Sequence, residues 1–588
     1  MTVSADRVRR FGCMTAIGLA LLASPVLAQQ PWPPAGPPPA TPPGSGPAPG
    51  PTGAPLSLFP PAPAGAEPAA ADPAPAATPP DARGVRGVMV EELKAQDPEL
   101  AGSLGPDNGG LSPDLWQGLP RGELESLIAA VPAGLTSPAL RDLASRLLLT
   151  AADGVGPGAK GRDLAALRAE ALVRVGNAAG ADTLRSLAPA VLEDEDAALA
   201  WLEMRYFTDD RQAACDQVPV LLGRFRHPVW QKWQIVCQIV AGQPDMALLG
   251  LDMLREQGEK DELFTLLAEG AITGNDRPVR GVPDPTPTQF ALILASGRAF
   301  PPETRITGAG PLAALARVES LALPQRLAAA ERAAALGGLT AEGLRSLYEA
   351  VPEPDPKTLT VAAAKKPTPL LRAQLIRALA AEPAPAAKAG LFRVAMLAAS
   401  TEMQAGTYGS LLLEEARQFR LTIGFASVAP MVARLHLLHG DLRNAGPWLN
   451  LARDDFNAGK DEGAFARLWP LAAAHGLVRE ADFDRTVWQR DLGGNAARDT
   501  VDSVLILLSA LENTPMALPP LADGSAPPGQ VKGAVLLDAI IALGTGGPAG
   551  MPAMDLAAIL TDLTRAGLGE QARRIGAEAI AGLLRPEA

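Results

Sequence analysis

Two cysteines are the residues of this chain best placed for covalent chemistry. Cys215 and Cys237 are 22 residues apart and almost symmetric about Arg226-His227-Pro228, where a helix should break. In an antiparallel helix hairpin, each cysteine would then lie about 11 residues, or roughly 16 Å, from the turn, so the two thiols would sit at matching heights. They would form a disulfide in an oxidising compartment, or remain buried reduced thiols. The absence of a Cys-x-x-Cys motif argues against a redox role.

Aromatic and basic side chains cluster close to the second cysteine. Trp230 and Trp233 are three residues apart, and Arg224, Arg226 and Lys232 lie beside them. One interpretation is a groove that binds a peptide or a glycan. The other is that the indole rings pack in the core while the arginines stay in solvent.

The histidines offer the one local arrangement that suggests a metal ligand. His436 and His439 are three residues apart on a predicted helix and therefore share a face. No acidic third ligand has suitable spacing and no His-Glu-x-x-His occurs, so we expect ordinary surface or turn histidines. Gly-x-Ser-x-Gly and a phosphate loop ending in Gly-Lys-Ser/Thr are also absent. The sequence therefore predicts no metal, no cofactor and no catalytic residue.

The composition indicates which elements position these residues. Of the 588 residues, 47% are hydrophobic but only 4% are aromatic, which is unfavourable for a large β-sandwich or barrel. Alanine and leucine dominate and are strong helix formers. The formal net charge of −12 should repel nucleic acid and anionic lipid, so we exclude a general nucleic-acid partner.

The N-terminus has the pattern of a secretory signal. Residues 1–28 contain three arginines ahead of the apolar stretch Phe11–Ala23, and Ser24–Ala28 ends in small residues suited to cleavage. The apolar stretch is shorter than the roughly 20 residues that a membrane-spanning helix needs, and no later segment of that length lacks charge. We expect an exported protein, periplasmic or alternatively secreted, with no transmembrane segment in the mature chain.

A proline-rich leader is predicted over residues 29–87. Between Gln29 and Pro80 there are 20 prolines and only two charged residues, Glu67 and Asp72. Proline removes a backbone donor and restrains the residue before it, so neither a helix nor a strand ladder can propagate. We expect a disordered, semi-extended tether.

From about residue 88 onward, the hydrophobic pattern is that of amphipathic helices. One stripe with spacing of three and four residues comprises Leu124, Leu127, Ile128 and Val131. Helix starts are predicted at Ser112-Pro113, at Ser137-Pro138 and at the capping-box sequence Thr286–Gln289. Three interruptions rich in Pro, Gly and Asp divide this part into helical blocks at 88–273, 287–350, 369–513 and 531–588.

A glycine followed five residues later by alanine recurs along the chain. The best instance is His439–Ala445, followed by Leu449 and Ala452. Further Gly-to-Ala steps are Gly176/Ala181, Gly242/Ala247, Gly476/Ala481 and Gly567/Ala572. The pattern resembles a degenerate tetratricopeptide repeat, in which a helix ends at the glycine and the small alanine lets the next helix pack closely. The family's aromatic positions and closing proline are mostly missing here. The resemblance implies an all-α fold of antiparallel helix hairpins stacked as an α-solenoid.

These features favour a non-enzymatic periplasmic scaffold that binds an envelope protein or peptide. The oligomeric state is open. One alternative is a cell-wall enzyme such as a peptidoglycan hydrolase, for which Glu125-Ser126 supplies a catalytic-type dipeptide without the surrounding aromatic and glycine signature. A further alternative is a passive structural protein of the envelope.

Overall fold

Helices are the regular elements of the computed structural model. It describes residues 97–208, 210–274, 284–297, 304–457, 464–478, 488, 492, 496–511 and 531–584. Within these ranges the chain contains α- and 3-10 helices and no strand, only one isolated bridge between Leu104 and Thr150. The all-α prediction is therefore confirmed for this part of the chain. The predicted signal sequence 1–28 and leader 29–87 lie outside it.

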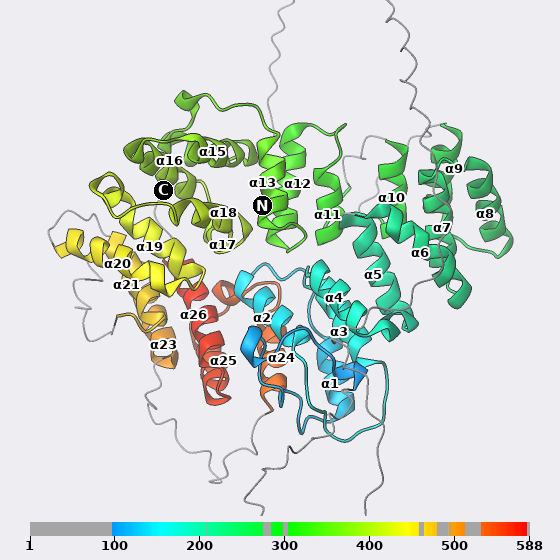
Figure 1. Cartoon of the computed structure of the whole chain (residues 1–588), viewed down its shortest axis with the longest axis horizontal. Coiled ribbons are helices and arrows are strands. Elements are labelled where there is room, and N and C mark those ends of the chain that lie inside the picture. Colours follow the sequence, from blue (N-terminus) through cyan, green and yellow to red (C-terminus); the bar gives the residue numbers. More distant parts are fainter. Residues whose placement is uncertain are drawn as a thin grey trace, which may run out of the picture. The chain divides into compact units, whose positions relative to one another are not determined.

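The α-helices are short and follow one another closely (Figure 1). Their bounds are α1 Arg121–Ala129, α2 Pro138–Leu149, α3 Leu164–Arg174, α4 Ala178–Leu187, α5 Glu195–Thr208, α6 Arg211–Arg224, α7 Pro228–Val240, α8 Pro244–Glu256, α9 Glu262–Thr273, α10 Pro287–Ser296, α11 Ala309–Ala316, α12 Leu323–Ala335, α13 Ala341–Glu349, α14 Val361–Ala364, α15 Pro369–Ala381, α16 Pro385–Leu397, α17 Thr401–Ala405, α18 Thr407–Ala416, α19 Ala429–Leu438, α20 Leu442–Asn457, α21 Ala464–Ala474, α23 Ala496–Leu511, α24 Lys532–Leu543, α25 Ala553–Arg565 and α26 Gly569–Leu583.

Two of the three predicted helix starts are confirmed. Ser137 caps α2, its hydroxyl accepting from the Leu140 N–H, and the capping box at Thr286–Gln289 opens α10. Ser112-Pro113 begins only a run of turns. Pro120 closes this segment and disfavours helical geometry in the residue before it.

Glycine turns join several helix hairpins as the Gly-to-Ala pattern predicts. Four of these glycines have a positive φ between 68° and 82°, which a residue with a Cβ adopts at a cost. They end α3, α7, α19 and α25, and the alanine five residues on is fully buried in the helix that follows. The pairs are Gly176 with Ala181, Gly242 with Ala247, Gly440 with Ala445 and Gly567 with Ala572. In the fifth step Gly476 also has a positive φ, whereas Ala481 lies outside the described residues.

The helices pack mainly against their neighbours in the chain, and the first helices also pack against the last. Within the compact unit Glu91–Ala588, α1 and α2 contact α24, and α2 contacts α26 (Figure 1). Glu578 of α26 accepts from the backbone N–H of Ala139 at the start of α2, at 3.0 Å. Arg574 pairs with Asp142 at 2.5 Å. Contacts between sequence neighbours alone therefore do not account for the packing of this unit.

Buried arginines join the ends of helices to other parts of the core. Arg168 donates to the carbonyl oxygens of Leu148 and Thr150 at the end of α2, and Arg434 donates to Ala581 near the end of α26. Burial lowers the pKa of both guanidinium groups to about 10. They still carry a proton at neutral pH, and they satisfy carbonyls that a helix leaves unpaired at its C-terminus.

None of the helices in the described ranges combines the length and the apolar character needed to cross a membrane.

Candidate functional site

Cys215 and Cys237 meet across the α6–α7 hairpin. Their sulfur atoms are bonded at 2.01 Å, with Cα atoms 5.5 Å apart. The turn between the helices contains His227, whose Nδ1 accepts from the Val229 N–H and caps α7. The structure therefore has a disulfide that ties the ends of one hairpin together, well away from the turn.

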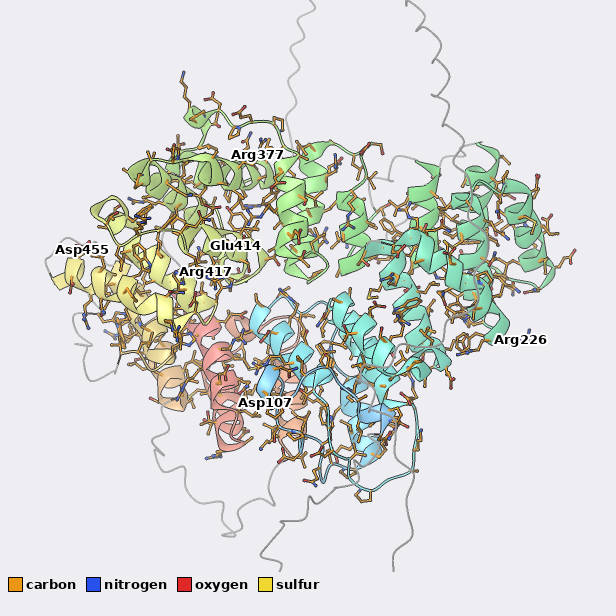
Figure 2. All side chains as sticks on the ribbon, viewed as in Figure 1. Asp107, Arg226, Arg377, Glu414, Arg417 and Asp455 are labelled. Carbon is orange, nitrogen blue, oxygen red and sulfur yellow. A yellow bond between two sulfur atoms is a disulfide. The ribbon has the colours of Figure 1, made fainter. Side chains whose placement is uncertain are left out.

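The neighbouring tryptophans do not line a groove. Trp230 and Trp233 are fully buried, and the indole N–H of Trp230 donates to Glu195 at 2.9 Å. Arg224 is exposed and donates to the carbonyl of Leu192, and Arg226 lies on the surface (Figure 2). Of the two interpretations of this cluster, the structure has the one in which the indole rings pack in the core and the arginines stay in solvent, not the peptide or glycan groove.

The next helix, α8, has an apolar face that nothing in the described chain covers. Met246, Leu249 and Met253 are 52%, 56% and 48% exposed. Their spacing of three and four residues places them on one side of the helix. The opposite side of α8 is buried against its neighbours through Ala247, Leu251 and Leu254. We call Met246, Leu249 and Met253 the α8 apolar stripe.

Acidic residues border this stripe. Asp245, Asp252 and Glu256 are all exposed on α8, and helical periodicity places them along the edge next to Leu249. Arg255 pairs with Asp252 at 2.9 Å and with Glu269 of α9. The edge therefore has more carboxylates than cations, and the stripe combines apolar contact area with a negative border.

The spacing of apolar residues in the sequence of α8 carries a signal for this stripe. The buried residues of α8 already account for one face of an amphipathic helix. Two methionines and a leucine repeat at helical spacing on another face, which indicates a second apolar surface of the helix. Whether another helix covers that face depends on tertiary packing and could not be derived from the local pattern.

His436 is buried and not at the surface as expected, whereas His439 is half-buried in the turn after α19, as expected of a turn histidine. His436 is 1% exposed and its Nδ1 is 3.0 Å from Asp441 Oδ2. His439 Nε2 is 2.9 Å from the carbonyl oxygen of Gln404. Desolvation lowers the pKa of both rings. α19 packs against α17, which carries Gln404, whereas Asp441 lies in the turn between α19 and α20.

No set of three or more His, Cys, Asp or Glu side chains within the described ranges is arranged to hold a metal ion.

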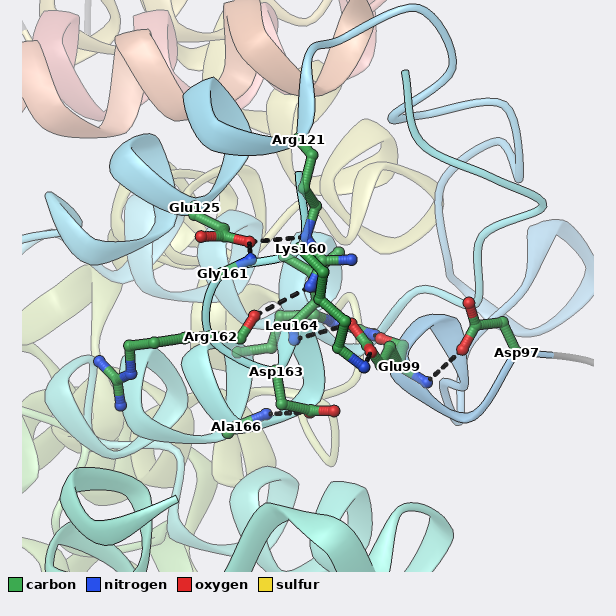
Figure 3. A network of polar contacts seen from close by, with 11 residues as sticks. Asp97, Glu99, Arg121, Glu125, Lys160, Gly161, Arg162, Asp163, Leu164 and Ala166 are labelled. Atoms are coloured by element: carbon green, nitrogen blue, oxygen red, sulfur yellow. Dashed lines mark hydrogen bonds and ion pairs between the residues drawn. The ribbon is translucent and has the colours of Figure 1, made fainter. Parts of the chain in front are cut away.

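The Glu125-Ser126 dipeptide belongs to a structural network (Figure 3). Glu125 pairs with Arg121 at 2.7 Å and accepts from the Gly161 N–H at 3.1 Å. Ser126 donates to the carbonyl of Gly122 within its own helix. Arg121 also pairs with Glu99 at 2.6 Å. Glu125 thus holds α1 to the segment around Gly161, and the Ser126 hydroxyl is engaged within α1 itself.

Comparisons with protein-family models, with curated proteins and with solved structures find no significant match to this chain.

Proposed function

We propose that this chain is a non-enzymatic helical-repeat scaffold of the cell envelope, exported to the periplasm, which binds another protein through the α8 apolar stripe. The observation that carries the proposal is the exposure of Met246, Leu249 and Met253 on a helix whose other face is already buried. Methionine adapts to varied partner surfaces because its side chain is unbranched and polarizable. Apolar stripes of this kind commonly mark protein interaction sites.

The proposed partner segment is a basic amphipathic helix. Its apolar face would cover the stripe, and its Lys or Arg residues would face Asp245, Asp252 and Glu256. Removing the exposed half of each of the three side chains from water contributes about 1 kcal/mol per residue. A second copy of this chain is disfavoured as the partner, because its net charge of −12 opposes association.

The glycine-turned hairpins support the repeat part of the proposal. Four hairpins share a positive-φ glycine followed five residues later by a buried alanine. That geometry is what a tetratricopeptide-like unit requires for close packing of its two helices. We propose that the chain derives from such hairpins stacked as an α-solenoid, with the signal sequence and proline-rich leader directing it to the envelope and spacing it there.

A labelled model helix of leucine and lysine, with one apolar and one basic face, tests the binding surface. We expect saturable binding to the purified mature chain by fluorescence anisotropy. Leu249→Arg should weaken it at least tenfold, because it places a cation in the centre of the stripe. Leu421→Arg is the matched control, since Leu421 is 54% exposed and lies outside this surface. Binding that Leu249→Arg leaves unchanged would contradict the proposal, as would equal loss in both variants.

Two further measurements separate this function from its alternatives. Photo-crosslinking from position 249 in living cells should yield a discrete adduct with one envelope protein, which position 421 does not yield. Light scattering should give the same mass for wild type and Leu249→Arg, whereas a mass that halves would identify the stripe as a self-association surface. Clearing of peptidoglycan in a zymogram would replace the scaffold by the hydrolase alternative.

A further inference from the structure

A cavity of about 630 Å³ lies among helices α3 and α5, the starts of α10 and α11, and the α12–α13 turn. Its volume falls within the range of small-molecule sites. Its walls are largely apolar and include Val173, Leu199, Met204, Phe207, Pro311 and Leu336. The α8 apolar stripe contributes nothing to this lining, so the cavity is a separate feature of the chain.

Three carboxyl groups and one guanidinium line the cavity. Glu170 and Arg174 pair with each other at 2.7 Å, and Arg174 also donates to the carbonyl of Ile128. Asp196 is 74% exposed and lies 3.7 Å from an arginine outside the lining. Glu203 is the only one of the four for which the described residues supply no ion pair. The net charge of these four groups is therefore negative, and the carboxyl group without an ion pair is that of Glu203 on α5.

The surroundings of Glu203 set its protonation. Burial raises the pKa of its carboxyl to about 7, and the indole N–H of Trp233 opposes this rise. Trp233 is fully buried, and its indole N–H faces the Glu203 carboxyl. Glu203 thus lies between the buried indole of Trp233 and the cavity that it lines.

We propose that this cavity binds a small organic amine, with the protonated amino group paired to Glu203 and an apolar body against the walls. An ammonium supplies the counter-charge that the protein itself does not provide. The apolar lining would hold a hydrocarbon or aromatic group, Phe207 offering a ring face. An anion would meet the surplus of carboxylates, and a neutral polyol would leave most of its hydroxyls without partners on these walls.

Binding should depend on pH in a defined direction. The ionisable groups lining the cavity with Glu203 are Glu170, Arg174 and Asp196. Glu203, whose pKa burial raises to about 7, is the group whose charge changes near neutrality. The amine binds the ionised carboxylate, so affinity should fall about tenfold per pH unit below pH 7 and level off above it. Binding at pH 7 should release part of a proton.

2-Phenylethylammonium is the probe, and 2-phenylethanol is its uncharged analogue. Titration calorimetry of the mature protein at pH 8 should give one saturable site for the amine. Glu203→Gln keeps the shape of the protonated side chain and should lower the affinity for the amine at least tenfold, with less than a twofold effect on the alcohol. Asp196→Asn removes another carboxylate from the same cavity and should change affinity less than twofold.

A second measurement needs no variant. Repeating the wild-type titration at pH 7 in two buffers of different ionisation enthalpy measures the protons released on binding. A fraction near one half supports the assignment to Glu203. No saturable binding at millimolar amine, no proton release, or equal effects of Glu203→Gln and Asp196→Asn would each overturn the proposal.

Discussion

Removal of the Cys215–Cys237 disulfide should loosen one hairpin by a calculable amount. The bond closes a loop between residues 22 apart in sequence. Loop-closure entropy for this length is about 11 cal/mol/K, which corresponds to about 3.4 kcal/mol at 25 °C. Replacing both cysteines by alanine removes this restraint from the opened hairpin and leaves the charge of the protein unchanged. The free energy of opening α6–α7 should fall by this amount.

Amide hydrogen exchange is the appropriate assay, because a chain of this size need not unfold in one step. Since about 1.4 kcal/mol corresponds to a factor of ten, exchange of the buried amides of α6 and α7 should accelerate roughly 300-fold in the variant. The α25–α26 hairpin has a similar glycine turn and contains no cysteine, so its exchange serves as the internal control.

A rise of less than threefold in α6–α7 would refute the reasoning. It would mean either that the hairpin opens only with the whole unit or that its opened state stays compact without the bond. An equal acceleration in α25–α26 would show instead that the disulfide acts on global stability. Reduced wild-type protein should reproduce the behaviour of the double variant.

The remaining predictions concern stability, measured by chemical denaturation. Gly533→Ala should lower the free energy of unfolding by about 2 kcal/mol or more, because the new Cβ would lie 2.3 Å from an indole ring and 2.6 Å from a backbone oxygen. Gly546 has open space around it, so Gly546→Ala should change the free energy of unfolding by less than about 0.5 kcal/mol. Gly440→Ala should lower the free energy of unfolding by about 1 kcal/mol, because the φ of Gly440 is 68°. Gly390→Ala on the exposed face of α16 should raise the free energy of unfolding by about 0.5 kcal/mol. Equal effects of the two substitutions would contradict the turn geometry. Burial lowers the pKa of His475 to about 4, so between pH 6.5 and 4 the folded state binds fewer protons than the unfolded state. The free energy of unfolding should therefore fall by up to about 3 kcal/mol as the pH is lowered from 6.5 to 4. His475→Gln should flatten this part of the pH profile.

Local features of the sequence were predictable because their physical causes are local. Ser137 and Thr286 cap helices through hydrogen bonds to residues three positions away. A glycine turn such as the one at Gly440 needs only a positive φ and a small residue five positions later. The positions of Cys215 and Cys237 could be compared because one hairpin contains both. In each case the chain within about 25 residues determines the outcome.

Features that depend on distant segments were not predictable in the same way. Trp230 was compatible with a groove or with the core, and its polar partner in the core is Glu195, 35 residues earlier, which accepts from its N–H. The burial of His436 was not expected, because it results from the packing of α19 against other helices, and the partner of His439 is the carbonyl oxygen of Gln404, 35 residues earlier. Glu203 carried no signal, since its raised pKa results from burial beside Trp233.

The buried arginines at helix ends show why such long-range features nevertheless follow a rule. A helix leaves its last carbonyls unpaired, and packing many short helices into one unit buries a large number of these ends. Arg168 and Arg434 resolve this by donating several hydrogen bonds from one planar group to carbonyls of other segments. Lysine could not bridge them, because its three donors sit on one nitrogen atom. In a chain of short Ala- and Leu-rich helices, buried arginine is therefore expected wherever helix ends converge, and the position of each one is fixed by the tertiary packing rather than by its neighbours in sequence.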